Sequence, residues 1–157
     1  MMKIKIVAVG KIKESYFKLA IEEYVKRLSR FATVEIMEVD ECLFKGIPNE
    51  KEIERVIKKE GAEILQKVEG YVFALDIDGK ELNSIELAEK LSSLKQNYNT
   101  FTFVIGGSNG LSPEVKKRAD FRLSFGKITL PHQLCRVVLT EQIYRAFCIQ
   151  NNIPYHK

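Results

Sequence analysis

The sequence lacks the features that mark a secreted, membrane-bound or zinc-binding protein. Its three cysteines, Cys42, Cys135 and Cys148, are an odd number and contain no C-x-x-C pair. This count argues against a disulfide framework and a zinc site, and it fits a reducing cytoplasm. No apolar run is long enough to span a bilayer, and Met1-Met2-Lys3 leads directly into a predicted strand instead of a signal peptide. We therefore expect a cytoplasmic protein with no membrane partner.

Several common catalytic and ligand-binding motifs are missing as well. The chain contains no G-x-G-x-x-G fingerprint, no Walker A loop and no G-x-S-x-G nucleophile elbow. No group of Asp, Glu and His residues has the spacing of metal ligands, and Asp76 and Asp78 are better explained as turn formers. We expect no metal site. No repeat, low-complexity tract or linker divides the chain, which predicts a single domain over residues 1–157.

The composition is that of an ordinary folded protein. Hydrophobic residues make up 45% and charged residues 29% of the chain, which argues against disorder. The net charge of +4 permits an anionic partner but falls short of the strongly basic signal of a dedicated nucleic-acid binder.

Hydrophobic patterns predict strands that alternate with helices. The predicted strands are Lys3–Val9, Val34–Val39, Tyr71–Ile77, Thr100–Ile105 and Phe121–Phe125. The predicted helices cover Glu14–Ser29, a segment after Asn49, a segment opened by an Asn83/Glu86 capping box, Pro113–Arg118 and His132–Gln150. This alternation predicts an α/β fold with an open, mostly parallel sheet flanked by helices.

The stretch from Thr100 to Pro113 is the centre of the predicted fold. Its strand has apolar residues on both faces, and a glycine turn from Gly106 to Gly110 follows at once. Ser112-Pro113 then has the pattern of a helix start. Open α/β sheets bind ligands at such strand-to-helix turns. A purely structural tight turn explains the glycines equally well.

A second candidate region runs from Gly126 to Arg136, an apolar loop that ends in Pro131-His132 at a helix start. The positive end of the helix dipole suits a neutral imidazole acting as a base or hydrogen-bond partner. A surface histidine near a helix cap is the simpler interpretation from spacing alone.

The last helix carries Arg136 and Arg145 on an otherwise apolar sequence, and Glu141 lies four residues before Arg145. These charges fit either a buried ion pair or an anionic ligand at an interface. The tail that follows contains Tyr155, His156 and Lys157, and is either frayed or docked against a site.

Four separated motifs together resemble one family. They are VAVGK near the start, TFVIGGSNGLSPEV up to Val115, LPHQLCRVVLTEQIYRAF in the last helix, and a terminal PYHK. In order and over the whole chain they are similar to the RlmH group of large-subunit ribosomal RNA methyltransferases, within the SPOUT class.

The resemblance implies an open α/β domain whose C-terminal segment forms a trefoil knot, a topology that general chain rules would exclude. It also implies a homodimer. The implied reaction transfers a methyl group from S-adenosylmethionine to N3 of a pseudouridine. The implied target lies in helix 69 of large-subunit (23S) rRNA on the assembled 70S ribosome.

The resemblance also assigns roles to individual residues. It implies that His132, Arg145, Tyr155 and His156 act in catalysis, with His132 and the tail residues left as alternative proton acceptors. Arg136 and Lys157 are implied to contact the RNA. The implied cofactor contacts are Leu75, Gly106, Phe125, Gly126, Lys127, Ile128, Thr129 and Leu130.

Two other functions remain open from the sequence. One is a nucleotide- or RNA-binding protein without catalysis, in which the same turn holds a ligand. The other is a flavodoxin-like domain without a knot, which would bind phosphate at Ser108–Gly110.

Overall fold

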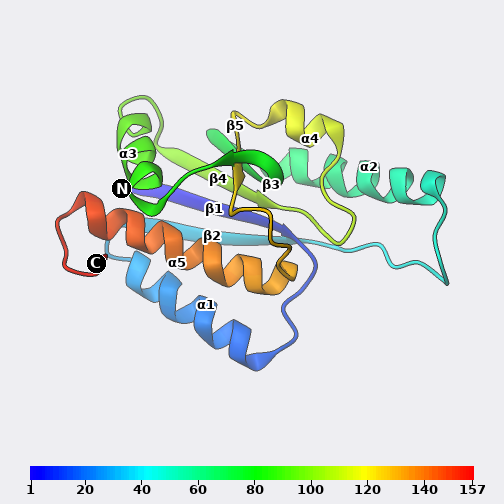
Figure 1. The fold of residues 1–157 in the computed structure, drawn as a ribbon, viewed down its shortest axis with the longest axis horizontal. Helices are drawn as coiled ribbons and strands as arrows, with labels where there is room; N and C mark the ends of the chain where they lie inside the picture. Colours follow the sequence, from blue (N-terminus) through cyan, green and yellow to red (C-terminus); the bar gives the residue numbers. More distant parts are fainter.

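The computed structural model describes residues 1–157, and five strands form one sheet in it (Figure 1). The strands are β1 (Met2–Val9), β2 (Ala32–Val39), β3 (Tyr71–Glu81), β4 (Thr100–Ile105) and β5 (Phe121–Ser124). Their order across the sheet is β2-β1-β4-β3-β5, and every adjacent pair is parallel. The predicted α/β class and mostly parallel sheet are therefore confirmed.

Helices cover both faces of this sheet. They are α1 (Ser15–Leu28), α2 (Glu50–Lys67), α3 (Ser84–Leu94), α4 (Pro113–Arg118) and α5 (His132–Gln150). The buried residues of α1, α3 and α5 share one cluster with one face of the sheet, and those of α2 and α4 share a second cluster with the other face. No helix is long and apolar enough to cross a membrane.

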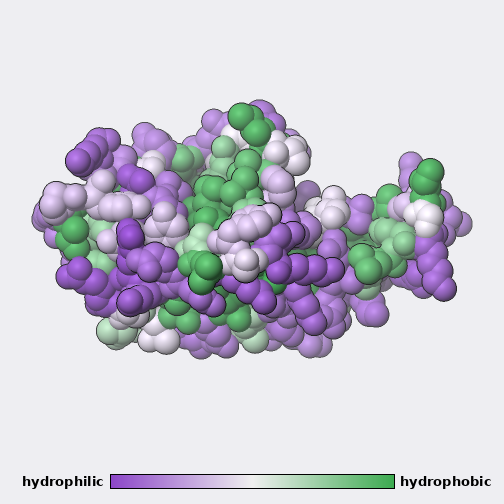
Figure 2. All heavy atoms as spheres, turned by 90° about the horizontal axis from the view of Figure 1, so that it is seen from below, coloured by the Kyte–Doolittle hydropathy of each residue, from purple (hydrophilic) through white to green (hydrophobic).

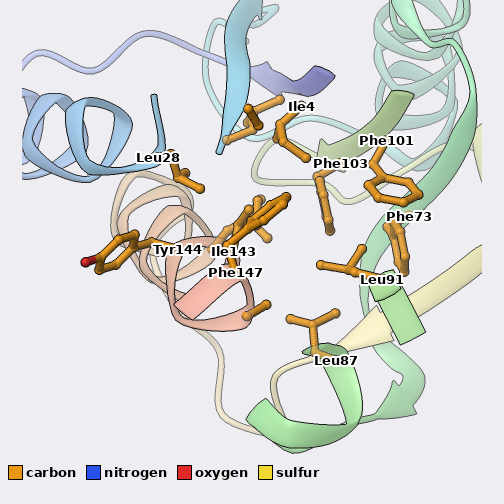
Figure 3. Close-up of a cluster of buried hydrophobic side chains, with 14 of the residues drawn as sticks. Ile4, Leu28, Phe73, Leu87, Leu91, Phe101, Phe103, Ile143, Tyr144 and Phe147 are labelled. Atoms are coloured by element: carbon orange, nitrogen blue, oxygen red, sulfur yellow. The ribbon is translucent and has the colours of Figure 1, made fainter. Parts of the chain in front are cut away.

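The larger cluster is an aromatic core between the sheet and the three helices α1, α3 and α5 (Figure 3). The rings of Phe73 and Phe103, from neighbouring strands, stack with their centroids 4.7 Å apart. Leu28, Leu91 and Phe147 join the same cluster from the three helices and are almost fully buried. Because α5 lies between α1 and α3, its position is fixed from both sides by packing.

Strand β4 is buried along its whole length. All six of its residues are buried, as the sequence predicted for a strand covered on both faces. Phe101 and Phe103 belong to the core with α5, whereas Val104 belongs to the cluster with α2 and α4. Because this central strand is packed on both faces, it fixes the position of the glycine turn that follows it at the edge of the sheet.

Strand β3 differs from the prediction. The sequence predicted a strand that ends at Ile77 with a turn at Asp78-Gly79, but the strand continues to Glu81. At the position of the expected turn the strand forms a bulge, in which both Leu75 and Lys80 align with Leu123 of β5. The Asp78 N–H donates to the Asp76 side chain within this bulge, at 3.0 Å. Pairing with β5 resumes beyond it, so the local turn signal did not end the strand.

The predicted capping box at the start of α3 is confirmed. The Glu86 N–H donates to the Asn83 side chain and the Asn83 N–H donates to the Glu86 side chain, each at 2.8 Å. We expect Asn83→Ala to lower the free energy of unfolding by about 1 kcal/mol, because the Glu86 N–H loses its side-chain acceptor and the reciprocal pair is broken. Urea denaturation would measure the loss. Asn97→Ala is the matched control, since Asn97 is exposed and caps no helix, and it should change stability by less than about 0.5 kcal/mol. Equal losses in both variants would contradict the prediction.

Candidate active site

A cavity of about 660 Å³ opens at the carboxyl edge of the sheet, beyond the ends of β3, β4 and β5. This volume is in the usual range for small-molecule sites, about 300–1,000 Å³. The cavity also lies where open α/β sheets bind ligands, near the point at which the strand order reverses between β1 and β4. Its lining includes Leu75, Asp76, Ile77, Ile105, Gly106, Gly107, Ser108, Gly110, Leu111, Leu123, Phe125, Gly126, Ile128, Thr129, Leu130, Pro131, His132 and Cys135.

The glycine turn after β4 forms one wall of the cavity. A Cβ added at Gly106 would lie 3.0 Å from the Leu111 side chain, and one added at Gly107 would lie 3.0 Å from Val9. These glycines are therefore required for close packing of the turn onto its neighbours. At the far end of the turn, the Ser112 hydroxyl accepts from the Val115 N–H at 3.2 Å and begins α4, as predicted.

The opposite wall is the loop between β5 and α5. Its first turn is fixed by Ser124, whose hydroxyl accepts from the Gly126 N–H at 3.0 Å and donates to the Ile77 carbonyl at 3.1 Å. Ile128 on this loop is 79% exposed although it lines the cavity. An apolar side chain left in water beside a cavity suits a ligand that would cover it.

His132 begins α5 at the edge of the cavity. A Cβ added at Gly10, which follows β1, would lie 3.3 Å from Nε2 of His132. The ring therefore packs against the end of β1 and is held between that backbone and the cavity.

Arg136 is one turn further along α5 and lies inside the protein. Its side chain is 3% exposed, donates to Glu38 at 2.8 Å and donates to the Gly10 carbonyl at 3.2 Å. Arg136 is thus buried and paired with a carboxylate within the chain, and its implied contact with RNA stays a prediction. Arg136 holds the start of α5, with His132, against the ends of β1 and β2.

The other end of α5 carries a second polar cluster around Glu141. Arg145 Nε donates to Glu141 at 2.9 Å, which confirms the predicted i,i+4 pair. The Tyr155 hydroxyl donates to the same carboxylate at 3.0 Å, and an Arg145 N–H lies 3.2 Å from Nδ1 of His156. The Tyr155 ring also packs edge-on against Tyr144, with centroids 4.9 Å apart. The tail is therefore docked onto α5, one of the two alternatives left open by the sequence.

This cluster sets the protonation of its members. Burial and the hydrogen bond to Glu141 raise the pKa of Tyr155 to about 12. The hydrogen bond to Glu141 also raises the pKa of Arg145. In this arrangement the Tyr155 hydroxyl is protonated near neutral pH and donates a hydrogen bond to Glu141.

The two ends of α5 are far apart within one chain. His132 and Arg145 are thirteen residues apart on one helix, which corresponds to about 20 Å at 1.5 Å per residue. The four residues implied to act in catalysis therefore fall into two groups, His132 at the cavity and Arg145, Tyr155 and His156 at the tail.

The implied cofactor contacts mostly gather in the cavity. Lys127 is the exception, because its side chain is 72% exposed and pairs with Asp78 at 3.5 Å. The lining residues Asp76, Ile77 and Cys135 were not assigned to the site from the sequence. The position of Ile77, two residues after Leu75 on β3, is the signal that could have identified it. Burial raises the pKa of the Cys135 thiol to about 11, so it fills space and is not a nucleophile.

Comparisons with known proteins agree closely with one another. A family model described as "Predicted SPOUT methyltransferase" matches residues 2–156. The curated "Ribosomal RNA large subunit methyltransferase H" of Limosilactobacillus reuteri is 53% identical, with 99% of this chain and all of that protein covered. Proteins of the same name from Lactiplantibacillus plantarum and Clostridioides difficile are 54% and 52% identical, with the same coverage.

A solved structure supports the fold. A "probable methylase family protein" from Haemophilus influenzae superposes with a TM-score of 0.55 over 98% of this chain and 70% of that one. Its sequence identity is 15%, so the likeness concerns the arrangement of strands and helices.

Proposed function

The chain belongs to the SPOUT methyltransferase family, and from this premise we propose that it transfers a methyl group from S-adenosylmethionine to large-subunit ribosomal RNA. The observation that carries the proposal is the glycine-walled cavity at the carboxyl edge of the sheet, with His132 at its rim. The names of the full-length relatives support the class of substrate.

We further propose that the target is N3 of a pseudouridine in helix 69, reached on the assembled 70S ribosome in the cytoplasm. The resemblance of the glycine-turn, His132 and tail motifs supports this target. The chain has a modest net charge of +4 and a single α/β unit, so much of the recognition must come from the ribosome.

The cavity suits an adenosine-containing methyl donor. It combines an apolar wall, formed by side chains such as Leu75 and Leu130, with glycine backbone that permits close approach. Such a donor supplies a methyl group on a sulfonium, which a nitrogen nucleophile can attack without a metal. The residues around the cavity have to hold the target base in line with that bond, which is worth up to about 7–11 kcal/mol.

The remaining chemical task is removal of the N3 proton of the base. His132 lines the cavity and can accept this proton, which typically contributes about 10²–10⁴-fold to the rate. Tyr155 is less suited as the acceptor because its pKa is raised to about 12 by burial and by its bond to Glu141.

We propose that two copies of the chain complete each site. One chain cannot place its tail beside its own His132, since about 20 Å of helix separates His132 from Arg145. A second copy running antiparallel would bring its tail to this cavity. Figure 2 views the side of the molecule where α1 lies and shows apolar side chains gathered across its middle, which supports such a contact. Tyr16 and Leu19 of α1 are 64% and 65% exposed. The trefoil knot implied by the resemblance stays a prediction.

Incubation of the purified protein with labelled S-adenosylmethionine and ribosomes lacking the modification tests the proposed function. We expect stoichiometric label in the large-subunit RNA, located to one pseudouridine by nuclease mapping. RNA binding without label would favour a non-catalytic binding protein. A phosphate held at Ser108–Gly110 would favour the phosphate-binding alternative, although the Ser108 hydroxyl donates to the Glu41 carboxylate at 3.0 Å, and that negative charge repels an anion.

A further inference from the structure

The lining of the cavity combines apolar and polar side chains. Apolar side chains, among them Leu75, Ile77 and Leu130, line one part of it. Ser108 of the glycine turn and His132 of α5 are polar residues of the same lining. Asp76 and Thr129 are the other polar lining residues with side-chain oxygen atoms, and Asp76 is already paired with cations. Ser108 and His132 are therefore candidates for contact with a charged part of a ligand.

Glu41, in the loop after β2, lies directly behind these two polar residues. Its Oε1 accepts the hydrogen bond of the Ser108 hydroxyl at 3.0 Å. Its Oε2 lies 3.5 Å from the position of a Cβ at Gly10, and Nε2 of His132 lies 3.3 Å from the same position. The carboxylate is thus placed between the glycine turn and the histidine. Glu41 is not itself part of the sequence motifs or of the implied site.

Two other carboxylates at this edge are already paired with cations. Asp76 is paired with Arg122 at 3.2 Å and with Lys116 at 3.8 Å. Glu38 is paired with Arg136.

Glu60, which also lies near the glycine turn, is buried and not paired with a cation. Burial raises the pKa of its carboxyl, and the carboxyl accepts from the Cys42 N–H at 3.3 Å. Glu41 likewise has no cation within 4.0 Å. It therefore supplies an uncompensated negative charge next to Ser108 of the cavity lining.

A methyl donor of the sulfonium class carries positive charge in two places, on the sulfur and on the α-ammonium of its amino-acid end. Burying such a charge is costly unless an anion or hydrogen-bond acceptors accompany it. The sulfonium also has to point at the base that it methylates, whereas the ammonium is remote from the reacting atoms. The ammonium is therefore the group that a fixed carboxylate can hold throughout the reaction.

We propose that Glu41 binds the α-ammonium of the amino-acid end of the methyl donor, with the Ser108 hydroxyl orienting its carboxylate. The proposal rests on the proposed function, since it assumes an adenosine-containing donor in this cavity. It makes Glu41 a residue that determines ligand specificity, by selecting the complete donor over adenosine compounds without the amino acid.

Isothermal titration calorimetry with three ligands tests this assignment. S-adenosylmethionine has both charges, S-adenosylhomocysteine keeps only the ammonium, and methylthioadenosine lacks both. We expect Glu41→Gln to lower the affinity for the first two ligands by about tenfold, which corresponds to the loss of a charge-assisted hydrogen bond. The affinity for the third ligand should change by less than about twofold. Glu54→Gln on α2 is the matched control, because Glu54 is exposed and makes no ion pair, and it should bind all three as the unmodified chain does.

Each other outcome overturns the proposal. Weakening of S-adenosylmethionine alone would mean that Glu41 senses the sulfonium. Equal weakening of all three ligands would mean that Glu41 only supports the shape of the cavity, and thermal unfolding of the variant would show the accompanying loss of stability. Unchanged affinities would remove Glu41 from the site. If the unmodified chain binds none of the three, the proposed function itself fails, and the two failures are thereby distinguished.

Discussion

His132→Ala is expected to reduce the rate of methyl transfer by about 10²–10⁴-fold while donor affinity stays within about twofold of the unmodified chain. His132 lines the cavity at its rim, and its ring packs against the end of β1 at Gly10. The two walls of the cavity are the glycine turn and the loop before α5. Loss of the imidazole removes a proton acceptor but leaves both walls in place. The effect should therefore fall on the chemical step and not on binding.

Single-turnover kinetics with saturating donor, paired with calorimetric donor binding, separates these two effects. Gln133→Ala is the matched control, because Gln133 occupies the same turn of α5 but does not line the cavity. It should leave both quantities unchanged. A His132→Ala protein with a normal single-turnover rate would exclude His132 from the mechanism. Together with Glu41→Gln, which should alter binding, the two variants assign chemistry and ligand recognition to different residues.

The parts of the site that could be predicted from the sequence share one property. Gly106 and the loop from Phe125 to Leu130 both follow strands of a predicted parallel sheet, and the carboxyl ends of parallel strands meet at one edge. That rule brings the two segments together without knowledge of any side-chain contact. This prediction required neither the order of the strands nor the packing of α5 between α1 and α3.

Arg136 and Glu41 show why the rest could not be predicted. From the sequence, Arg136 fitted either a buried ion pair or an anionic ligand, and the fold shows an ion pair with Glu38 and a hydrogen bond to the Gly10 carbonyl. These partners are about a hundred residues away in sequence, and only the fold brings them to α5. Helix α5 contacts neighbours on several sides, so its pattern does not indicate which face an arginine occupies. The role proposed for Glu41 likewise depends on its contact with Ser108, which lies in a different loop.

The position of the tail leads to the second large expected effect. A chain that ends at Pro154 loses Tyr155, His156 and Lys157, and we expect its methyl-transfer rate to fall by about 10²–10⁴-fold if these residues act on the base or its phosphates. The Tyr155 ring and hydroxyl contact Tyr144 and Glu141, so some stability will be lost as well. Activity of the truncated chain alone does not distinguish a catalytic tail from a structural one.

Mixed dimers make that distinction. If the tail acts on the partner's cavity, co-refolding the truncated chain with His132→Ala chains should restore activity. A mixed dimer then has one intact site, formed by His132 of the truncated chain and the tail of the other. Because half of the dimers are mixed and each has one working site of two, the recovered rate should be about a quarter of that of the unmodified protein. Recovery would also show that the truncated chain folds and pairs. If the mixture is no more active than its two components, either the tail and His132 belong to the same chain's site or the tail has no catalytic role. The separation of roughly 20 Å between the two ends of α5 argues against the first interpretation.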